Sequence, residues 1–325
     1  MQRRALGLLF LVLALALAGI AVLVPAVRHY WQLYHDAYPL YSAKEYTGFQ
    51  FGHRQVIEFF RQHYDDYDLE LLTTRKSNQA DVFLRFYDGL RQPPRTDIMP
   101  PYEHRERMQV GDASRYQHYE TPDRRMLFAV LPDEVPLFAD ADVKERVIAP
   151  DGSAAFVLVA ASRLRDFVST WMVHGPLPED DHSPPPNWAP DHRPRGRSWR
   201  LYDQPAAGVG LNDFFSVNAD YACAWALNFV TSDVERDVRV FAGFDDRGEV
   251  WVNGEQVELQ QTEDPEATLV DHETGTLHLR ADRNTIAVRT CETVADWRFY
   301  FRLENLDGTP VQDLQWEYGP RAAPE

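Results

Sequence analysis

The stretch at residues 243–259, GFDDRGEVWVNGEQVEL, holds a short strand signal between two turn signals. Side chains alternate across a strand, so Val250 and Val252 are expected on one face and Trp251 and Asn253 on the other. An Asn-Gly dipeptide closes this segment, and that pair is typical of a two-residue hairpin turn. The stretch therefore predicts a β-hairpin with one apolar face.

Similar strand signals recur on both sides of this hairpin. Each is short, rich in Val, Phe, Trp and Thr, and bounded by Gly, Asp or Asn. The segments are YACAWALNFVT (221–231), DVRVFAGF (237–244), GEVWVNGEQVEL (248–259), TGTLHLR (274–280), NTIAVRTC (284–291) and WRFYFRLEN (297–305). This spacing predicts an antiparallel β-sandwich.

The hairpin also carries residues that could bind a ligand. Asp245 and Asp246 are most simply turn residues that bond their own backbone, because a calcium site needs several more converging oxygen ligands. A sugar platform needs an exposed aromatic ring with polar neighbours, although core packing competes for every Trp. The candidate ligand-binding residues are Trp251, Asn253, Asp245, Asp246 and Trp297.

Only two cysteines occur, Cys223 and Cys291, and both fall on predicted strands of one sandwich. They lack the CxxC spacing and the nearby His pair of a structural zinc site, so we expect no metal and no cofactor. In an oxidising compartment they are a candidate disulfide.

The same region resembles the galactose-binding-like jelly-roll domains appended to many bacterial extracellular enzymes and surface proteins. The resemblance covers residues 165–318 and rests on the order WMVHGPLP, LNDFFSVNADYACAWALNFVTSD, VRVFAGFDDRGEVWVNGEQV and LHLRADRNTIAVRTCETVADWRFYFRLENLDGTPV. It implies a domain similar to carbohydrate-binding modules, many of which bind no sugar.

The preceding region mixes helix and strand signals. HRQVIEFFRQHYDDYD, from residue 53, has the apolar spacing of an amphipathic helix, and LELLTTRK, from residue 69, alternates like a strand. QADVFLRFYDGL supplies another apolar run, and RMLFAVLPDEVP and AAFVLVAAS are typical of buried strands. The succession predicts a small α/β domain.

Residues 20–160 resemble the soluble tail of glycosyltransferases of the protein O-mannosyltransferase and aminoarabinose-transferase superfamily. The motifs are YTGFQFGHRQVIEFFRQHYDDYDLELLTTRKSNQADVFLRFY, VGDASRYQHY, RRMLFAVLPDEVP and ERVIAPDGSAAFVLV. Those enzymes carry a catalytic body of many membrane helices, and this sequence has one span. The resemblance therefore implies a related module without transferase activity, because one helix cannot build a membrane-embedded donor site.

An uncharged apolar run, ALGLLFLVLALALAGIAVLVPAV (5–27), is long enough to cross a bilayer as a helix. Arg3 and Arg4 precede it and favour a cytoplasmic N-terminus, while Tyr30, Trp31 and Tyr34 follow where an aromatic belt would meet the headgroups. A cleaved signal peptide ending at ALAG (16–19) is the competing interpretation.

The net charge of -17 argues against nucleic-acid binding, which depends on clustered Lys and Arg. We expect a cytoplasmic tip and transmembrane anchor (1–30), a periplasmic α/β domain (31–162), a β-sandwich (163–318) and a tail (319–325). The predicted function is a non-catalytic scaffold that is bound to the bacterial inner membrane by one span and braces other membrane subunits of a photosynthetic, respiratory or glycan-handling complex. The alternatives are a tethered glycan-binding protein and a component of a lipid-linked-sugar glycosyltransferase.

Overall fold

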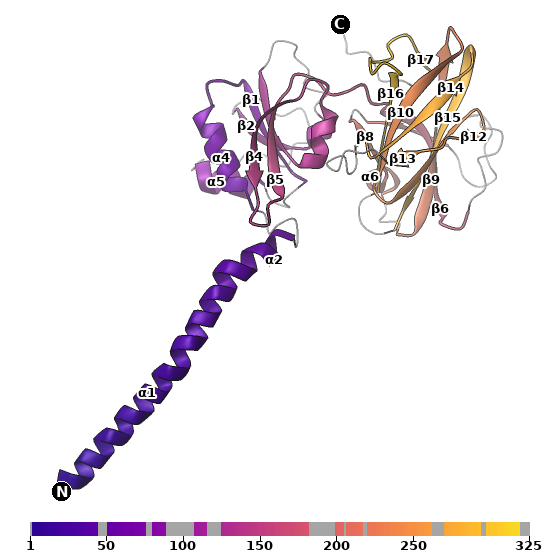
Figure 1. Cartoon of the computed structure of the whole chain (residues 1–325). Helices are drawn as coiled ribbons and strands as arrows, with labels where there is room; N and C mark the ends of the chain where they lie inside the picture. The colour runs from indigo at the N-terminus through magenta and orange to yellow at the C-terminus, as the bar shows by residue number, and fades with distance from the viewer. Residues whose placement is uncertain are drawn as a thin grey trace.

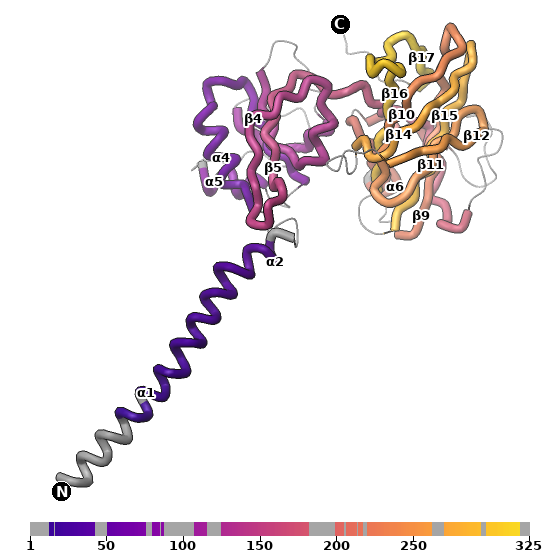
Figure 2. The backbone as a smooth tube through the Cα atoms, viewed as in Figure 1, coloured from indigo at the N-terminus to yellow at the C-terminus, as the bar shows by residue number. Residues whose placement is uncertain are grey.

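The computed structural model describes residues 2–44, 51–75, 80–88, 107–115, 125–181, 199–204, 206–216, 220–261, 270–293 and 297–318. The chain begins with one long helix that leads away from two β-rich bodies (Figure 1; Figure 2). The predicted 319–325 tail lies outside the described residues.

The long helix is α1 (Gln2–Gln32), and it continues through a π-helical turn (Leu33–Ala37) into α2 (Tyr38–Lys44). At 1.5 Å per residue α1 is about 47 Å long, and the helical stretch Leu13–Ser42 is long and apolar enough to cross a membrane. Arg3 and Arg4 lie in its first turn. Tyr30, Trp31 and Tyr34 are exposed near its other end, where the rings of Tyr30 and Tyr34 stack at 6.1 Å.

The first body is a five-stranded mixed sheet in the order β2-β1-β3-β5-β4. β2, β1 and β3 are parallel, whereas β5 is antiparallel to both of its neighbours. The strands are β1 (Leu69–Thr73), β2 (Met108–Gly111), β3 (Met126–Val130), β4 (Asp142–Ile148) and β5 (Ala154–Ala160). A short 3₁₀ helix, Pro132–Leu137, follows β3.

Both faces of this sheet are buried. On one face the strands share a core with the helices α4 (His53–Gln62) and α5 (Ala80–Asp88). The described part of the apolar run QADVFLRFYDGL, residues 80–88, is therefore helical. On the other face, Leu71 and Phe128 belong to a core that also contains Phe167, from the segment between β5 and the next strand, and Tyr300 of the following body.

The second body, called the β body below, consists of two antiparallel sheets; the sheet of the first body is called the α/β sheet. The two sheets of the β body have the strand orders β13-β14-β10-β16-β8 and β12-β11-β15-β9-β6-β7, and β17 pairs with β9. The predicted strand segments are all observed. The strands are β6 (Thr170–Pro178), β7 (Arg200–Asp203), β8 (Gly208–Gly210), β9 (Ala222–Ser232), β10 (Arg236–Phe244), β11 (Arg247–Val252), β12 (Glu255–Gln256), β13 (Gln260–Gln261), β14 (Glu273–Leu279), β15 (Asp282–Glu292), β16 (Arg298–Asn305) and β17 (Gln315–Trp316). One apolar core draws side chains from both sheets, so the mostly antiparallel β body is confirmed.

β16 holds the two bodies together because both of its faces are buried. Phe299, Phe301 and Leu303 point into the core between the two antiparallel sheets, whereas Tyr300 belongs to the core shared with the α/β sheet. Arg302 makes an isolated β-bridge to Phe167, in the segment that joins the bodies. The bodies therefore share a core as well as a covalent connection.

Candidate functional site

The hairpin at residues 243–259 forms as the sequence predicts. Val250 and Val252 lie in the core between the sheets, and Trp251 points to the outer face of its sheet. Asn253 (φ 50°) and Gly254 (φ 88°) both take the left-handed backbone conformation, which an Asn-Gly hairpin turn requires. The side chain of Asn253 also bonds to β15, because its amide nitrogen donates to the Asn284 carbonyl oxygen at 2.8 Å.

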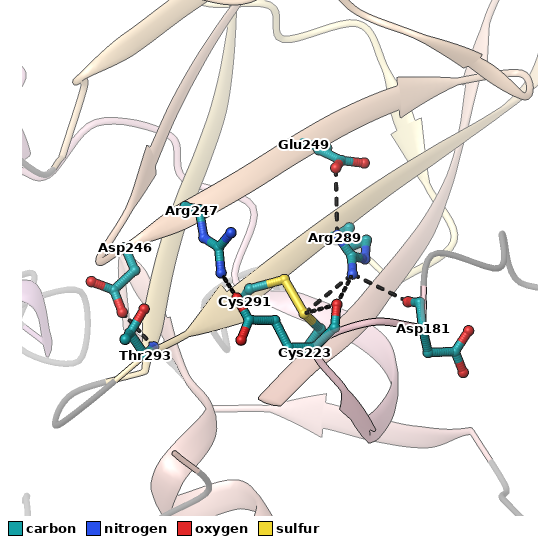
Figure 3. A network of polar contacts seen from close by, with 9 residues as sticks. Asp181, Cys223, Asp246, Arg247, Glu249, Arg289, Cys291 and Thr293 are labelled. Carbon is teal, nitrogen blue, oxygen red and sulfur yellow. Dashed lines mark hydrogen bonds and ion pairs between the residues drawn. A yellow bond between two sulfur atoms is a disulfide. The ribbon is translucent and has the colours of Figure 1, made fainter. Parts of the chain in front are cut away.

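Asp245 and Asp246 are exposed and lie in the turn between β10 and β11. The carboxylate of Asp246 accepts a hydrogen bond from the backbone of Thr293 (Figure 3), and the backbone nitrogen of Asp245 donates to the Arg298 carbonyl at 3.1 Å. Within the described residues, no group of three or more His, Cys, Asp or Glu side chains could hold a metal ion. The observed contacts make both aspartates links between neighbouring strands.

The two candidate tryptophans differ in exposure. Trp297 is fully buried between the sheets and stacks on Phe215 at 5.4 Å, so its ring offers no surface to a sugar. Trp251 is half-buried beside Trp225, with ring centroids 6.2 Å apart, and its indole nitrogen donates to Glu249 at 3.2 Å. Of the candidate aromatics, Trp251 alone keeps a partly exposed ring.

Cys223 and Cys291 face each other on β9 and β15 and form a disulfide on the outer face of this sheet (Figure 3). Arg289 lies beside it and is 5 % exposed. Its guanidinium donates to the carbonyl oxygens of Glu179 and Asp181 at 3.2 and 3.1 Å and pairs with Glu249 at 3.5 Å. This cluster ties the segment after β6 to the sheet.

A second polar cluster lies where the carboxyl ends of the parallel strands meet the β body. Thr73 ends β1, Asp112 follows β2, and Glu134 lies in the 3₁₀ helix that follows β3. Ligands of open α/β sheets bind at this edge, beyond the carboxyl ends of the strands. Here the β body covers the edge, and the backbone nitrogen of Ala207 donates to the Ser114 carbonyl at 2.7 Å.

Glu134 is fully buried at this edge. Its carboxylate oxygens accept hydrogen bonds from the Thr73 hydroxyl at 3.0 Å and from the Leu131 backbone nitrogen at 2.9 Å. Burial raises the pKa of Glu134 to about 7, although the guanidinium of Arg75 opposes the shift. The group therefore titrates near neutral pH.

This pKa shift predicts a pH-dependent stability. Between the ordinary pKa of 4.5 and the folded value of about 7, the folded state holds a proton that the unfolded state has released. The free energy of unfolding should therefore be highest below this window and fall by up to about 3 kcal/mol as the pH rises through it. Urea unfolding of the wild type and of Glu134→Gln between pH 4 and 8 measures the effect. In the variant, the free energy of unfolding should not fall in this way as the pH rises. The same pH dependence in both proteins would contradict the raised pKa of Glu134.

A pocket of about 240 Å³ opens at the same junction. Its wall in the α/β sheet carries Asp112, Ser114 and Arg115, which follow β2. Its wall in the β body is lined by Tyr202 of β7, Gly208 and Gly210 of β8, Asn212 of α6 (Leu211–Phe215) and Arg298 of β16.

Asp112 is the charged centre of the pocket. The backbone nitrogen and hydroxyl of Ser114 donate to this carboxylate at 2.9 and 2.6 Å, and the guanidinium groups of Arg298 and Arg115 lie 3.6 and 3.9 Å away. Burial alone would raise the pKa of Asp112, but Arg298, Ser114 and Arg115 hold this pKa below its usual range. Asp112 is therefore ionised at neutral pH and neutralises one of the two arginines.

The junction residues were not among those singled out from the sequence. Asp112 and Ser114 carry a usable signal, because polar residues directly after a buried parallel strand mark the carboxyl edge of the sheet. Arg298 carries no such signal, since it lies at residue 298 on a strand of the other body and only the packing of the two bodies brings it to Asp112.

No protein-family model matches the chain, and no curated protein matches it. Two anti-sigma factor domain-containing proteins, one of them from Clostridium clariflavum, match at TM-scores of 0.29 and 0.25 and identities of 12 % and 13 %. They cover 50 % and 53 % of this chain, which spans 49 % and 58 % of theirs.

A β-glucosidase from Kluyveromyces marxianus, in complex with glucose, matches at a TM-score of 0.28 and 12 % identity, over 47 % of this chain and 16 % of its own. The chain thus spans less than two thirds of each of these structures. Likenesses of this size carry no conclusion about activity. The resemblance to glycosyltransferase tails stays a prediction.

Proposed function

We propose that the protein is a non-catalytic scaffold, anchored by α1 in a bacterial inner membrane, with both β-rich bodies on the periplasmic side. In this role the two bodies brace neighbouring subunits of a larger membrane complex. The β body is then a galactose-binding-like jelly roll used for contact with proteins. The glycan-handling, respiratory and photosynthetic assemblies are the candidate settings.

The observation that carries this proposal is the burial of β16 on both faces. Domain interfaces within one chain are usually polar and allow relative motion. Here Tyr300 is 1 % exposed in a core shared by both bodies, and the ion pair between Arg298 and Asp112 crosses the same junction. A fixed orientation of two bodies suits a brace, whereas enzymes that close around a substrate need a hinge.

The membrane anchor is supported by the surface of α1. Leu13, Leu17, Val22 and Leu23 are all more than half exposed, and α1 projects away from the rest of the chain (Figure 1). Apolar side chains on an isolated helix of this length are stable in lipid and unfavourable in water. The disulfide between Cys223 and Cys291 supports an oxidising compartment for the β body.

The anchored scaffold makes a testable prediction. Full-length protein should stay with membranes after a carbonate wash, protease added to spheroplasts should digest both bodies, and mild detergent should release a stoichiometric complex. Replacing residues 5–27 with an unrelated single span should preserve both membrane attachment and the complex, because the outer bodies make the contacts in the proposed role. Release of the protein by the carbonate wash contradicts the proposed anchoring. Resistance of both bodies to protease added to spheroplasts also contradicts it. A monomer that binds polysaccharide through Trp251 would favour the glycan-binding alternative.

A further inference from the structure

We propose that the pocket at the junction of the two bodies binds a small hydroxylated anion, of monosaccharide size or smaller, through its carboxylate or phosphate group. This binding is separate from the proposed scaffold role. The pocket lies at the carboxyl edge of β1 and β2, which is the edge that binds ligands in open α/β sheets.

The charge of the pocket lining favours an anion. Arg115 and Arg298 contribute two positive charges and Asp112 one negative charge, which leaves a net charge of +1 among the described lining residues. This local excess is opposite in sign to the net charge of the whole chain, which is -17. A planar guanidinium presents its N–H groups as a fork that matches the two oxygens of a carboxylate or phosphate.

The other lining groups suit hydroxyls. The phenol oxygen of Tyr202 accepts a hydrogen bond from the Gly210 backbone nitrogen at 3.0 Å, and Asn212 and Ser114 add an amide and a hydroxyl to the wall. A volume of about 240 Å³ leaves room for a ligand of monosaccharide size. With two arginines and one carboxylate among its described lining residues, this polar pocket favours a sugar acid or sugar phosphate over a neutral sugar.

The glycines of β8 form the pocket wall. A Cβ atom added to Gly208 would lie 2.8 Å from the Tyr300 ring, so this position must stay glycine. A Cβ atom at Gly210 would have nothing within 4 Å, and Gly210 lines the pocket. A larger side chain at 210 can therefore fill the pocket without displacing the surrounding structure.

The test is isothermal titration of the full-length protein in detergent with glucuronate, glucose 6-phosphate, inorganic phosphate and glucose. We expect glucuronate or glucose 6-phosphate to bind at least tenfold more tightly than glucose. Arg115→Gln and Gly210→Val should each weaken this binding at least tenfold. Arg125→Gln, which removes an exposed cation paired with Asp68 in the same body, is the matched control and should bind as the wild type does.

The outcomes distinguish anion recognition in the pocket from recognition of a neutral sugar and from anion binding at another surface. Inorganic phosphate that binds as tightly as the sugar anions still supports an oxyanion site. Glucose that binds equally well overturns the charge argument. Anion binding that survives in a Gly210→Val protein with an unchanged melting temperature places the site elsewhere and overturns the proposal. A dissociation constant weaker than about 1 mM for every anion tested also overturns it. A failed scaffold test leaves each of these results unchanged.

Discussion

Replacing Asp271 with Ala should lower the free energy of unfolding by about 3 to 5 kcal/mol. Arg302 donates to both carboxylate oxygens of Asp271, from Nε at 2.9 Å and from Nη2 at 2.7 Å. The two side chains are 4 % and 10 % exposed. The variant would leave a buried guanidinium with Glu304 as its remaining carboxylate, and desolvation of a poorly compensated charge is costly.

A second bidentate pair on the same body is the matched control. Arg236 donates to both oxygens of Asp313 at 2.9 and 2.8 Å, but the Asp313 side chain is 63 % exposed. Asp313→Ala should therefore cost less than about 1 kcal/mol, because water already solvates the exposed Asp313 carboxylate and screens its attraction to Arg236. Urea unfolding followed by tryptophan fluorescence measures both changes. Equal losses in the two variants would show that burial does not determine the strength of these pairs.

A double variant separates charge from packing. Asp271→Leu combined with Arg302→Met removes both charges and keeps apolar volume, and buried ion pairs often tolerate such replacement. Glu304 then keeps Arg165 as a partner at 3.2 Å. The double variant should recover most of the stability that Asp271→Ala loses. If it is as unstable as the single variant, packing against Phe241, whose ring lies 3.8 Å from the Arg302 guanidinium, is the larger contribution.

The six strand segments predicted in the β body were recognisable because each carries an apolar face. In β11 the alternation of Val250 and Trp251 and the Asn-Gly turn agree, so local sequence and tertiary structure favour the same hairpin. β4 gave no such signal, since DVKERVI buries only Val147. The helix α5 was ambiguous because a short apolar run fits a strand and a buried helix equally well.

The junction was much harder to predict than the strands. WRFYFRLEN reads as a strand, but the sequence does not reveal that a second body covers the face that carries Tyr300 and Arg302. Long-range pairing also decides the role of Asp271, which lies 31 residues from its partner. The sequence predicts Trp297 as a candidate ligand-binding residue, but the side chain is buried. Its burial depends on how the two sheets pack together, which the alternation of residues along one strand does not specify.

Removal of the disulfide should destabilise the β body by about 4 kcal/mol, because Cys223 and Cys291 are separated by 68 residues and the cross-link restricts the unfolded chain. Cys223→Ala combined with Cys291→Ala should lower the melting temperature by about 10 °C, and dithiothreitol should lower that of the wild type similarly. The double variant is the control, because the reductant should leave its melting temperature unchanged.

The reduced protein should also lose order on the outer face of the sheet. Arg289 donates to Cys223 Sγ at 3.3 Å and to the carbonyls of Glu179 and Asp181, so separation of the two sulfurs loosens the support of the segment after β6. Hydrogen exchange at residues 177–181 should accelerate on reduction, while exchange in β1 and β3 stays slow. If the reductant changes neither the melting temperature nor the hydrogen-exchange rates of the wild type, the cross-link adds nothing to the pairing of β9 with β15.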